Sequence, residues 1–154
     1  MTSSPAAEAE HWHLRNLAAW SAGSIAAGAA VWAVGRARQH RAAAAFGRQN
    51  VMWGAVDGAI VAIAKLRGPR PEDPARSSRL RRVLLINAAL DVGYMAAGAV
   101  AMTAPSALIR PPRYLPADAR GDGAAIILQG GFLLVADLAA ARRLASAERA
   151  ATGD

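Results

Sequence analysis

The sequence contains no cysteine, a single lysine and few aromatic side chains. Without cysteine, the chain forms no disulfide bond and no thiolate metal site. Aromatic residues make up 5% of the chain although 54% of it is hydrophobic, so its interior must be built from small aliphatic side chains. The chain also lacks a P-loop, a dinucleotide-binding fingerprint, a G-x-S-x-G elbow and an H-E-x-x-H motif. We therefore expect no enzyme activity, no metal and no cofactor.

Charged residues are nearly absent from four stretches of the chain and are concentrated between them. The first stretch, residues 17–35, holds no charged residue over nineteen positions, close to the roughly 20 that a helix needs to cross a bilayer. The pattern predicts an all-α fold, a four-helix transmembrane bundle with both termini on the same side. Its helices are expected at about 17–35, 49–64, 83–104 and 124–141.

The segments between and around the apolar stretches are polar. Residues 36–48 are predicted to be a helical hairpin connection, and the proline-rich segments 65–82 and 105–123 to be loops, with Asp122 capping the last helix. The expected organisation is a polar N-terminal tail (1–16), which is retained because it does not read as a secretory signal, a single four-span membrane domain (17–141) and a polar C-terminal tail (142–154).

The positive charge of the chain, +7 at neutral pH, is carried almost entirely by arginine. The arginines flank the apolar stretches, where anionic lipid headgroups would lie, so the expected partner is the lipid bilayer and not nucleic acid. Eleven of the eighteen basic residues fall on the side of the termini, which predicts cytoplasmic termini. The excess of arginine, alanine and glycine indicates a GC-rich bacterial genome, and hence a multi-pass protein of the bacterial cytoplasmic (inner) membrane.

Polar side chains interrupt the third apolar stretch along one helical stripe. At 100° per residue this stripe carries Asn87, Asp91, Tyr94 and Gly98. Because polar groups in a membrane helix avoid lipid, we predict that this face looks at protein.

Two aspartates share one depth in the predicted bundle. Asp57 lies eight residues from Lys65, and Asp91 lies nine from Arg82, so both carboxylates are expected about 12–14 Å from that end at ~1.5 Å per residue. The helices that carry them, joined by the 65–82 loop, are predicted to be antiparallel neighbours. No basic side chain lies within any apolar stretch, so a shared or neutralising proton is the expected state of the pair.

The other intramembrane polar residues form two further levels by the same counting. Asn87 and Asp137 fall at about 7 Å, and Asn50 and Gln129 at about 20–22 Å. Asp137 is also within reach of the arginines at 142 and 143. The first helix is expected to contribute only Ser24 and small residues. Together the levels predict a continuous polar seam through the bundle, formed by Asn50, Asp57, Asn87, Asp91, Tyr94, Gln129 and Asp137.

Two functions from different classes are compatible with this seam. The leading hypothesis is a structural or partner-binding membrane bundle, in which interhelical hydrogen bonds hold the helices and the partner is a second copy of the chain or another membrane protein. The alternative is a small transporter or channel component that moves protons or a small polar solute along the seam, since intramembrane acids are commonly functional.

The same residues carry a resemblance to a known family. The segments concerned are Gln49-Asn50 with Trp53, then L-I-N-A-A-L-D-V-G-Y at residues 85–94 with Gly98, and G-D-G-A-A-I-I-L-Q-G-G-F-L-L at residues 121–134 with Asp137. In them the chain resembles a family of small bacterial four-span membrane proteins with a domain of unknown function. The resemblance runs from about the first helix to the fourth. It implies an integral membrane protein and supplies no activity.

Overall fold

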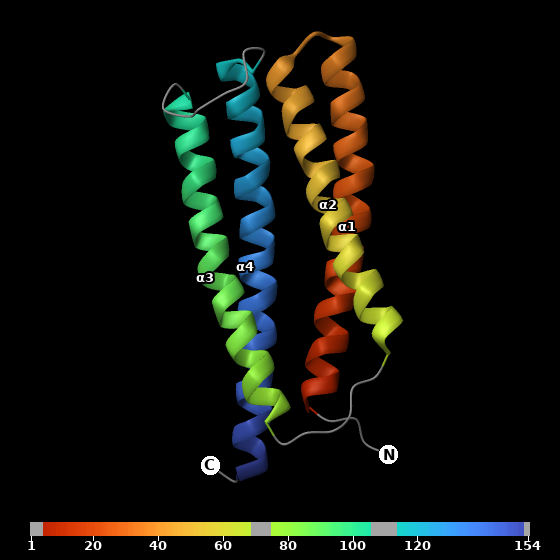
Figure 1. Ribbon diagram of the computed structural model, residues 1–154, viewed down its shortest axis with the longest axis vertical. Coiled ribbons are helices and arrows are strands. Elements are labelled where there is room, and N and C mark those ends of the chain that lie inside the picture. Colours follow the sequence, from red (N-terminus) through yellow and green to blue (C-terminus); the bar gives the residue numbers. More distant parts are fainter. Residues whose placement is uncertain (1–4, 69–74, 106–113, 153–154) are drawn as a thin grey trace.

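The computed structural model describes residues 5–68, 75–105 and 114–152, and these residues form four long α-helices without a β-strand. Successive helices run in opposite directions, so that α1 and α3 point one way and α2 and α4 the other, and the start of α1 and the end of α4 lie at the same end of the bundle (Figure 1). The predicted all-α class is confirmed. The helices are α1 (Pro5–Ala37), α2 (Arg41–Arg67), α3 (Arg76–Thr103) and α4 (Pro116–Thr152).

The first and last helices extend well beyond the apolar stretches. Residues 5–16 and 142–152, which the sequence analysis treats as polar tails, are helical. Hydropathy marks the part of a helix that suits lipid and does not mark where the helix ends. The two extensions pack with neighbouring residues of α3 and α4 in a small core at the terminal end of the bundle, which is formed by Ala6, Ala9, Leu84, Ala140, Ala141 and Leu144.

The predicted connection at residues 36–48 is reduced to a turn of three residues between α1 and α2. Gln39 takes a left-handed backbone conformation (φ 54°), and the His40 N–H donates to the Gly35 carbonyl over 2.8 Å, which closes the end of α1. His40 then caps α2, because its Nδ1 accepts a hydrogen bond from the Ala43 N–H at 3.1 Å. Residues 41–48 belong to α2.

The remaining helix ends also differ from the predicted ones. Gly68 ends α2 with a positive φ of 67°, and α3 stops just before Pro105. At the start of α4 the Asp118 carboxylate accepts from the Leu115 N–H at 2.8 Å, so the helix begins at Pro116. Asp122 therefore lies inside α4 and does not cap it. Of the predicted loops at 65–82 and 105–123, residues 65–67, 76–82 and 116–123 are helical, so the loops are shorter than predicted, and residues 69–74 and 106–113 lie outside the described residues.

The bundle consists of two hairpins, α1 with α2 and α3 with α4. The hairpins meet mainly where α2 packs on α4, and α1 also touches α4. The backbones of α2 and α3, although consecutive in the chain, do not lie side by side, so the predicted pairing of these helices is wrong. The long loop between α2 and α3 does not determine which helix each of them packs against. The three-residue turn at 38–40, in contrast, forces α1 and α2 to lie side by side.

Glycines set the close approach within each hairpin. A Cβ at Gly98 of α3 would lie 2.7 Å from the Gly123 carbonyl oxygen of α4, and a Cβ at Gly28 of α1 would lie 2.8 Å from the Gly47 carbonyl oxygen of α2. Both distances are too short for a side chain. Small residues thus let the helix backbones touch, as is usual when membrane helices associate.

The large apolar side chains point outward and the buried ones are mostly alanine. Exposed residues include Val34, Val56, Ile60, Leu90 and Val135. The helices α1, α3 and α4 are each long and apolar enough to cross a membrane, whereas α2 falls short of the same measure of apolarity. An apolar surface around a polar interior is compatible with a lipid environment.

Candidate functional site

Gln129 of α4 is the centre of a buried hydrogen-bond cluster that joins three helices. Its side chain is fully buried, and Nε2 donates to Asn50 Oδ1 of α2 at 2.9 Å and to Ser24 Oγ of α1 at 3.1 Å. Its Oε1 accepts from the Trp20 indole N–H of α1. Asn50 in turn donates to the Phe46 carbonyl at 2.9 Å. The deepest predicted level, Asn50 with Gln129, is confirmed as a direct contact, and both N–H groups of Gln129 are used.

Trp20 also belongs to this cluster, a polar role that was not predicted from the sequence. Besides its hydrogen bond to Gln129, its ring stacks on Phe132 with 4.1 Å between centroids and an interplanar angle of 4°. The spacing of Trp20 and Ser24 could have indicated this role, because residues four positions apart share a face of α1. A tryptophan near the end of an apolar stretch suggests an interfacial anchor instead.

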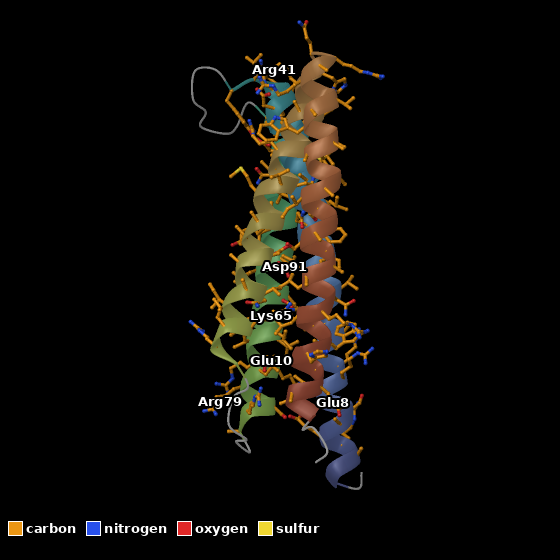
Figure 2. The ribbon with its side chains drawn as sticks, turned by 90° about the vertical axis from the view of Figure 1, so that its right-hand side faces the viewer. Glu8, Glu10, Arg41, Lys65, Arg79 and Asp91 are labelled. Carbon is orange, nitrogen blue, oxygen red and sulfur yellow. The ribbon has the colours of Figure 1, made fainter. Side chains whose placement is uncertain are left out.

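The mid-depth aspartates are buried and incompletely paired. Asp57 of α2 is 2% exposed and Asp91 of α3 is 4% exposed, and Oδ2 of each is buried without a hydrogen-bond partner among the described residues. The two carboxylates are close enough for Coulombic repulsion between them. Figure 2 shows Asp91 near the middle of the bundle's length, between Arg41 towards one end and Arg79 near the other.

Two aromatic side chains bridge α2 and α3 next to these carboxylates. The rings of Trp53 and Tyr94 meet edge to face, with 5.7 Å between centroids, and the Trp53 indole N–H is buried without a partner among the described residues. Trp53 lies one turn from Asp57, and Tyr94 one turn from Asp91. Side chains therefore connect the two helices whose backbones stay apart.

The predicted inward stripe of α3 is only partly inward. Asp91 and Gly98 are buried, but Tyr94 is 46% exposed and Asn87 is also exposed. The stripe that faces the bundle is instead rotated towards Leu84, Ala88, Asp91, Gly98 and Ala101. Asn87 and Tyr94 lie at its edge, because the close contact at Gly98 fixes the rotation of α3 against α4.

Asp137 of α4 lies at the level nearest the chain termini. Asp137 Oδ1 lies 3.3 Å from His13 Nε2 of α1, and the Asn87 side chain of α3 lies close to Asp137. The shared level of Asn87 and Asp137 is thus confirmed. Among the described residues Asp137 forms its ion pair with His13 and not with Arg142 or Arg143, and Arg143 lies over the ring of Trp12, 4.4 Å from its centroid.

These contacts arrange four titratable side chains in one succession. His13 pairs with Asp137, and Asp91 is within Coulombic reach of both Asp137 and Asp57. His13 was missed as a member because residues 1–16 were interpreted as a tail, although His13, Leu17 and Ser21 continue one helical face at four-residue spacing. We call His13, Asp137, Asp91 and Asp57 the acid chain. It brings titratable side chains near one another from the terminal end of the bundle to its middle.

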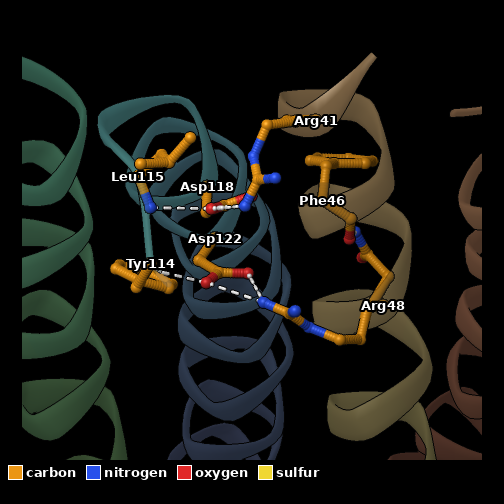
Figure 3. Close-up of polar contacts among 8 residues, drawn as sticks. Arg41, Phe46, Arg48, Tyr114, Leu115, Asp118 and Asp122 are labelled. Atoms are coloured by element: carbon orange, nitrogen blue, oxygen red, sulfur yellow. Dashed lines mark hydrogen bonds and ion pairs between the residues drawn. The ribbon is translucent and has the colours of Figure 1, made fainter. Parts of the chain in front are cut away.

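A second polar network joins α2 to α4 at the opposite end of the bundle. Arg41 donates to Asp118 at 2.6 Å, and Arg48 donates to both carboxylate oxygens of Asp122 at 3.1 Å (Figure 3). The Tyr114 hydroxyl donates to Asp122 at 2.6 Å. Burial, followed by this hydrogen bond and the negative charge of Asp122, raises the pKa of the Tyr114 phenol above its ordinary value.

Comparison with known proteins identifies one family. The model described as "Family of unknown function (DUF6992)" matches residues 16–138, from within α1 to the level of Asp137 on α4. No curated protein and no solved structure matches the chain.

Proposed function

Since the chain belongs to this family of unknown function, DUF6992, we propose its function from the geometry of the polar interior: it is a four-span membrane bundle that moves protons on its intramembrane carboxylates, as a small transporter or as a component of one. The acid chain supplies the proton-binding groups, and the apolar outer surface supplies the contact with lipid. The observation that carries the proposal is one buried carboxylate oxygen on each of Asp57 and Asp91 that finds no partner in the described part of the chain.

The direction of the helices supports four spans. α1 and α3 point the same way, and each is apolar and long enough to cross a membrane. If both cross in the same direction, the chain between them must return, and α2 is the helix that makes this return. Its 27 residues extend about 40 Å at ~1.5 Å per residue, more than the ~30 Å of a hydrocarbon core. Its lower apolarity follows from Asn50 and Asp57, which face the interior.

The Oδ2 atoms of Asp57 and Asp91, buried without a hydrogen-bond partner among the described residues, favour a proton-carrying role over a purely structural one. A buried polar atom without a partner lowers stability, so an interior that only holds helices together gains nothing from Asp57 and Asp91. Carboxylates inside a membrane are by default functional groups, and proton relays are built from chains of Asp, Glu and His. The acid chain has this composition.

Proton flux through reconstituted vesicles tests the proposal. We expect wild-type protein to dissipate an imposed pH gradient faster than protein-free vesicles do, and Asp57→Asn and Asp91→Asn to abolish the difference. Asp118→Asn is the matched control, because it makes the same acid-to-amide change outside the acid chain. Wild-type vesicles that hold the gradient as well as empty ones, or flux that survives both seam substitutions, would refute the proposal.

The saturated Gln129 cluster favours a second candidate, a structural bundle that binds a partner in the membrane. Its four side chains satisfy one another across α1, α2 and α4, as expected of groups that fix helix packing. Under this alternative Asp57→Asn and Asp91→Asn leave fold and partner binding intact, and the wild-type vesicles show no flux. The partner is then a second copy of the chain or another membrane protein.

The proposed site of action is the cytoplasmic membrane of a bacterium, with both termini in the cytoplasm. The composition of the chain supports the bacterial origin. The larger share of basic residues at the end that carries both termini supports the orientation.

A further inference from the structure

An open pocket of about 520 Å³ lies at the end of the bundle where α1 turns into α2, away from the acid chain. Its lining includes Trp32 and Arg36 of α1, Gln39 of the turn, Arg41 and Arg48 of α2, and Asp118 of α4. We propose that this pocket binds the phosphate-bearing headgroup of an anionic phospholipid.

The charge in the pocket favours an anion. Of the three arginines in the lining, Arg41 and Arg48 are paired with carboxylates of α4, and within the described residues no acidic side chain pairs with Arg36, which leaves one net positive charge. The planar guanidinium group matches the geometry of phosphate oxygens and can bind two of them at once. A phosphate group is therefore the anion that this lining fits best.

The arginines on α2 are held in place before any ligand arrives. Arg41 is fixed by Asp118 at 2.6 Å, and Arg48 is fixed by Asp122, which also accepts from Tyr114 (Figure 3). These ion pairs orient the long side chains along the pocket wall, so less conformational entropy is lost when a ligand binds. The same acids leave the pocket positive overall, because Arg36 adds a charge that neither of them balances.

The start of α2 adds a second attraction for a negative group. Gln39 and Arg41 of the lining lie at the N-terminus of this helix, whose first turn contains no acidic residue. The positive end of the α2 dipole therefore acts on the pocket, and Arg36 in the last turn of α1 offsets the negative end of that helix.

The position of the pocket identifies a lipid as the source of the phosphate. Trp32 lies near the end of the charge-free segment 17–35, where tryptophan favours the membrane interface, and Arg36 follows within one turn. If α1 crosses the membrane, this level is the headgroup layer, where phospholipids carry their phosphates and the anionic ones attract basic side chains. A headgroup bound at this pocket leaves its acyl chains in the adjacent hydrocarbon.

Lipid binding to the purified full chain in non-ionic detergent tests the inference. The probe is short-chain phosphatidylglycerol, titrated by calorimetry, with short-chain phosphatidylcholine and inorganic phosphate in parallel. We expect saturable binding of phosphatidylglycerol that weakens at high salt, and no saturable binding of the other two. Arg36→Gln should weaken the binding roughly tenfold, because it removes a charge-assisted hydrogen bond.

Arg142→Gln is the matched control. It removes one exposed arginine at the other end of the bundle and should leave the affinity unchanged. Thermal unfolding of both variants in detergent verifies that each is folded. Equal affinity of wild type and Arg36→Gln would overturn the proposal, as would equal binding of phosphatidylcholine. Inorganic phosphate that competes with the lipid would reassign the pocket to a free anion and overturn the lipid assignment.

Discussion

The polar side chains of the interior fall into two groups, those whose polar atoms all have hydrogen-bond partners and those with a buried polar atom that has none among the described residues. Gln129 has a partner for each of its polar atoms, whereas Asp57 and Asp91 each keep one buried oxygen without a partner in the described part of the chain. The depth of the polar residues could be predicted by counting from the charged ends of the helices. The hydrogen-bond partners of these residues could not be predicted in the same way, because they include side chains such as Trp20 that a search for polar residues in apolar stretches does not select.

Because every polar atom of Gln129 has a hydrogen-bond partner, we expect a large loss of stability when its side chain is replaced by alanine. Gln129→Ala leaves the Trp20 indole N–H, the side-chain oxygen of Asn50 and the Ser24 hydroxyl without their hydrogen-bond partner. The substitution should therefore lower the free energy of unfolding by about 2 kcal/mol. Gln49→Ala removes the same amide group from a half-buried position and should change the free energy of unfolding by less than about 0.5 kcal/mol. Denaturant titration in detergent micelles measures both. Similar effects of the two substitutions would show that the cluster contributes no special stability.

Tyr114 provides a pH-dependent prediction at the same scale. Its folded pKa is raised above the unfolded value of about 10, so its contribution to stability is fully present below pH 10 and is lost as the pH rises further. Tyr94→Phe leaves Tyr114 as the remaining tyrosine, whose ionisation is followed by ultraviolet absorbance. We expect ionisation well above pH 10, and an Asp122→Asn substitution in this background should move it down. Titration at the same pH as in the unfolded chain would contradict the Tyr114–Asp122 contact.

At the scale of the helices, the sequence predicts the existence and type of every element but misplaces several ends. Residues 5–16 are helical because Ala6 and Ala9 pack on α4, a tertiary contact that hydropathy does not register. Likewise α4 starts at Pro116 because Asp118 holds the Leu115 N–H. The polar extension of a membrane helix is invisible to a criterion that measures only the preference for lipid.

Two glycines of α3 make the packing of the elements testable with matched substitutions. A Cβ at Gly98 would lie 2.7 Å from a backbone oxygen of α4, whereas a Cβ at Gly93 meets nothing within 4 Å. Gly93→Ala should therefore stabilise the bundle by up to about 1 kcal/mol through helix propensity. Gly98→Ala should destabilise it by about 1–3 kcal/mol, because the helices must separate. Thermal unfolding in detergent distinguishes the two, and stabilisation by both would show that α3 and α4 are not in close contact at Gly98.

At the scale of the whole molecule, the two hairpins explain which predicted contacts form. The Asn50–Gln129 contact forms because α2 packs on α4. Asp57 and Asp91 come within Coulombic reach although α2 and α3 are not neighbours, because both helices turn their polar face towards the bundle axis. Depth counting thus predicts which residues share a level, but not which helix lies beside which, since the order of helices around a bundle is fixed by packing.

The central claim is that all four helices cross the membrane, because the mid-membrane position of Asp57 and Asp91 and the headgroup level of the arginine pocket both depend on it. The absence of cysteine makes the chain a clean background for single cysteines at exposed positions: Gln39→Cys and Thr103→Cys at one end of the bundle, and Ser78→Cys at the other. In sealed vesicles of known orientation, a membrane-impermeant thiol reagent should label Gln39→Cys and Thr103→Cys from one side and Ser78→Cys only from the opposite side. Labelling of Gln39→Cys and Ser78→Cys from the same side would show that α2 does not cross, and would contradict the account.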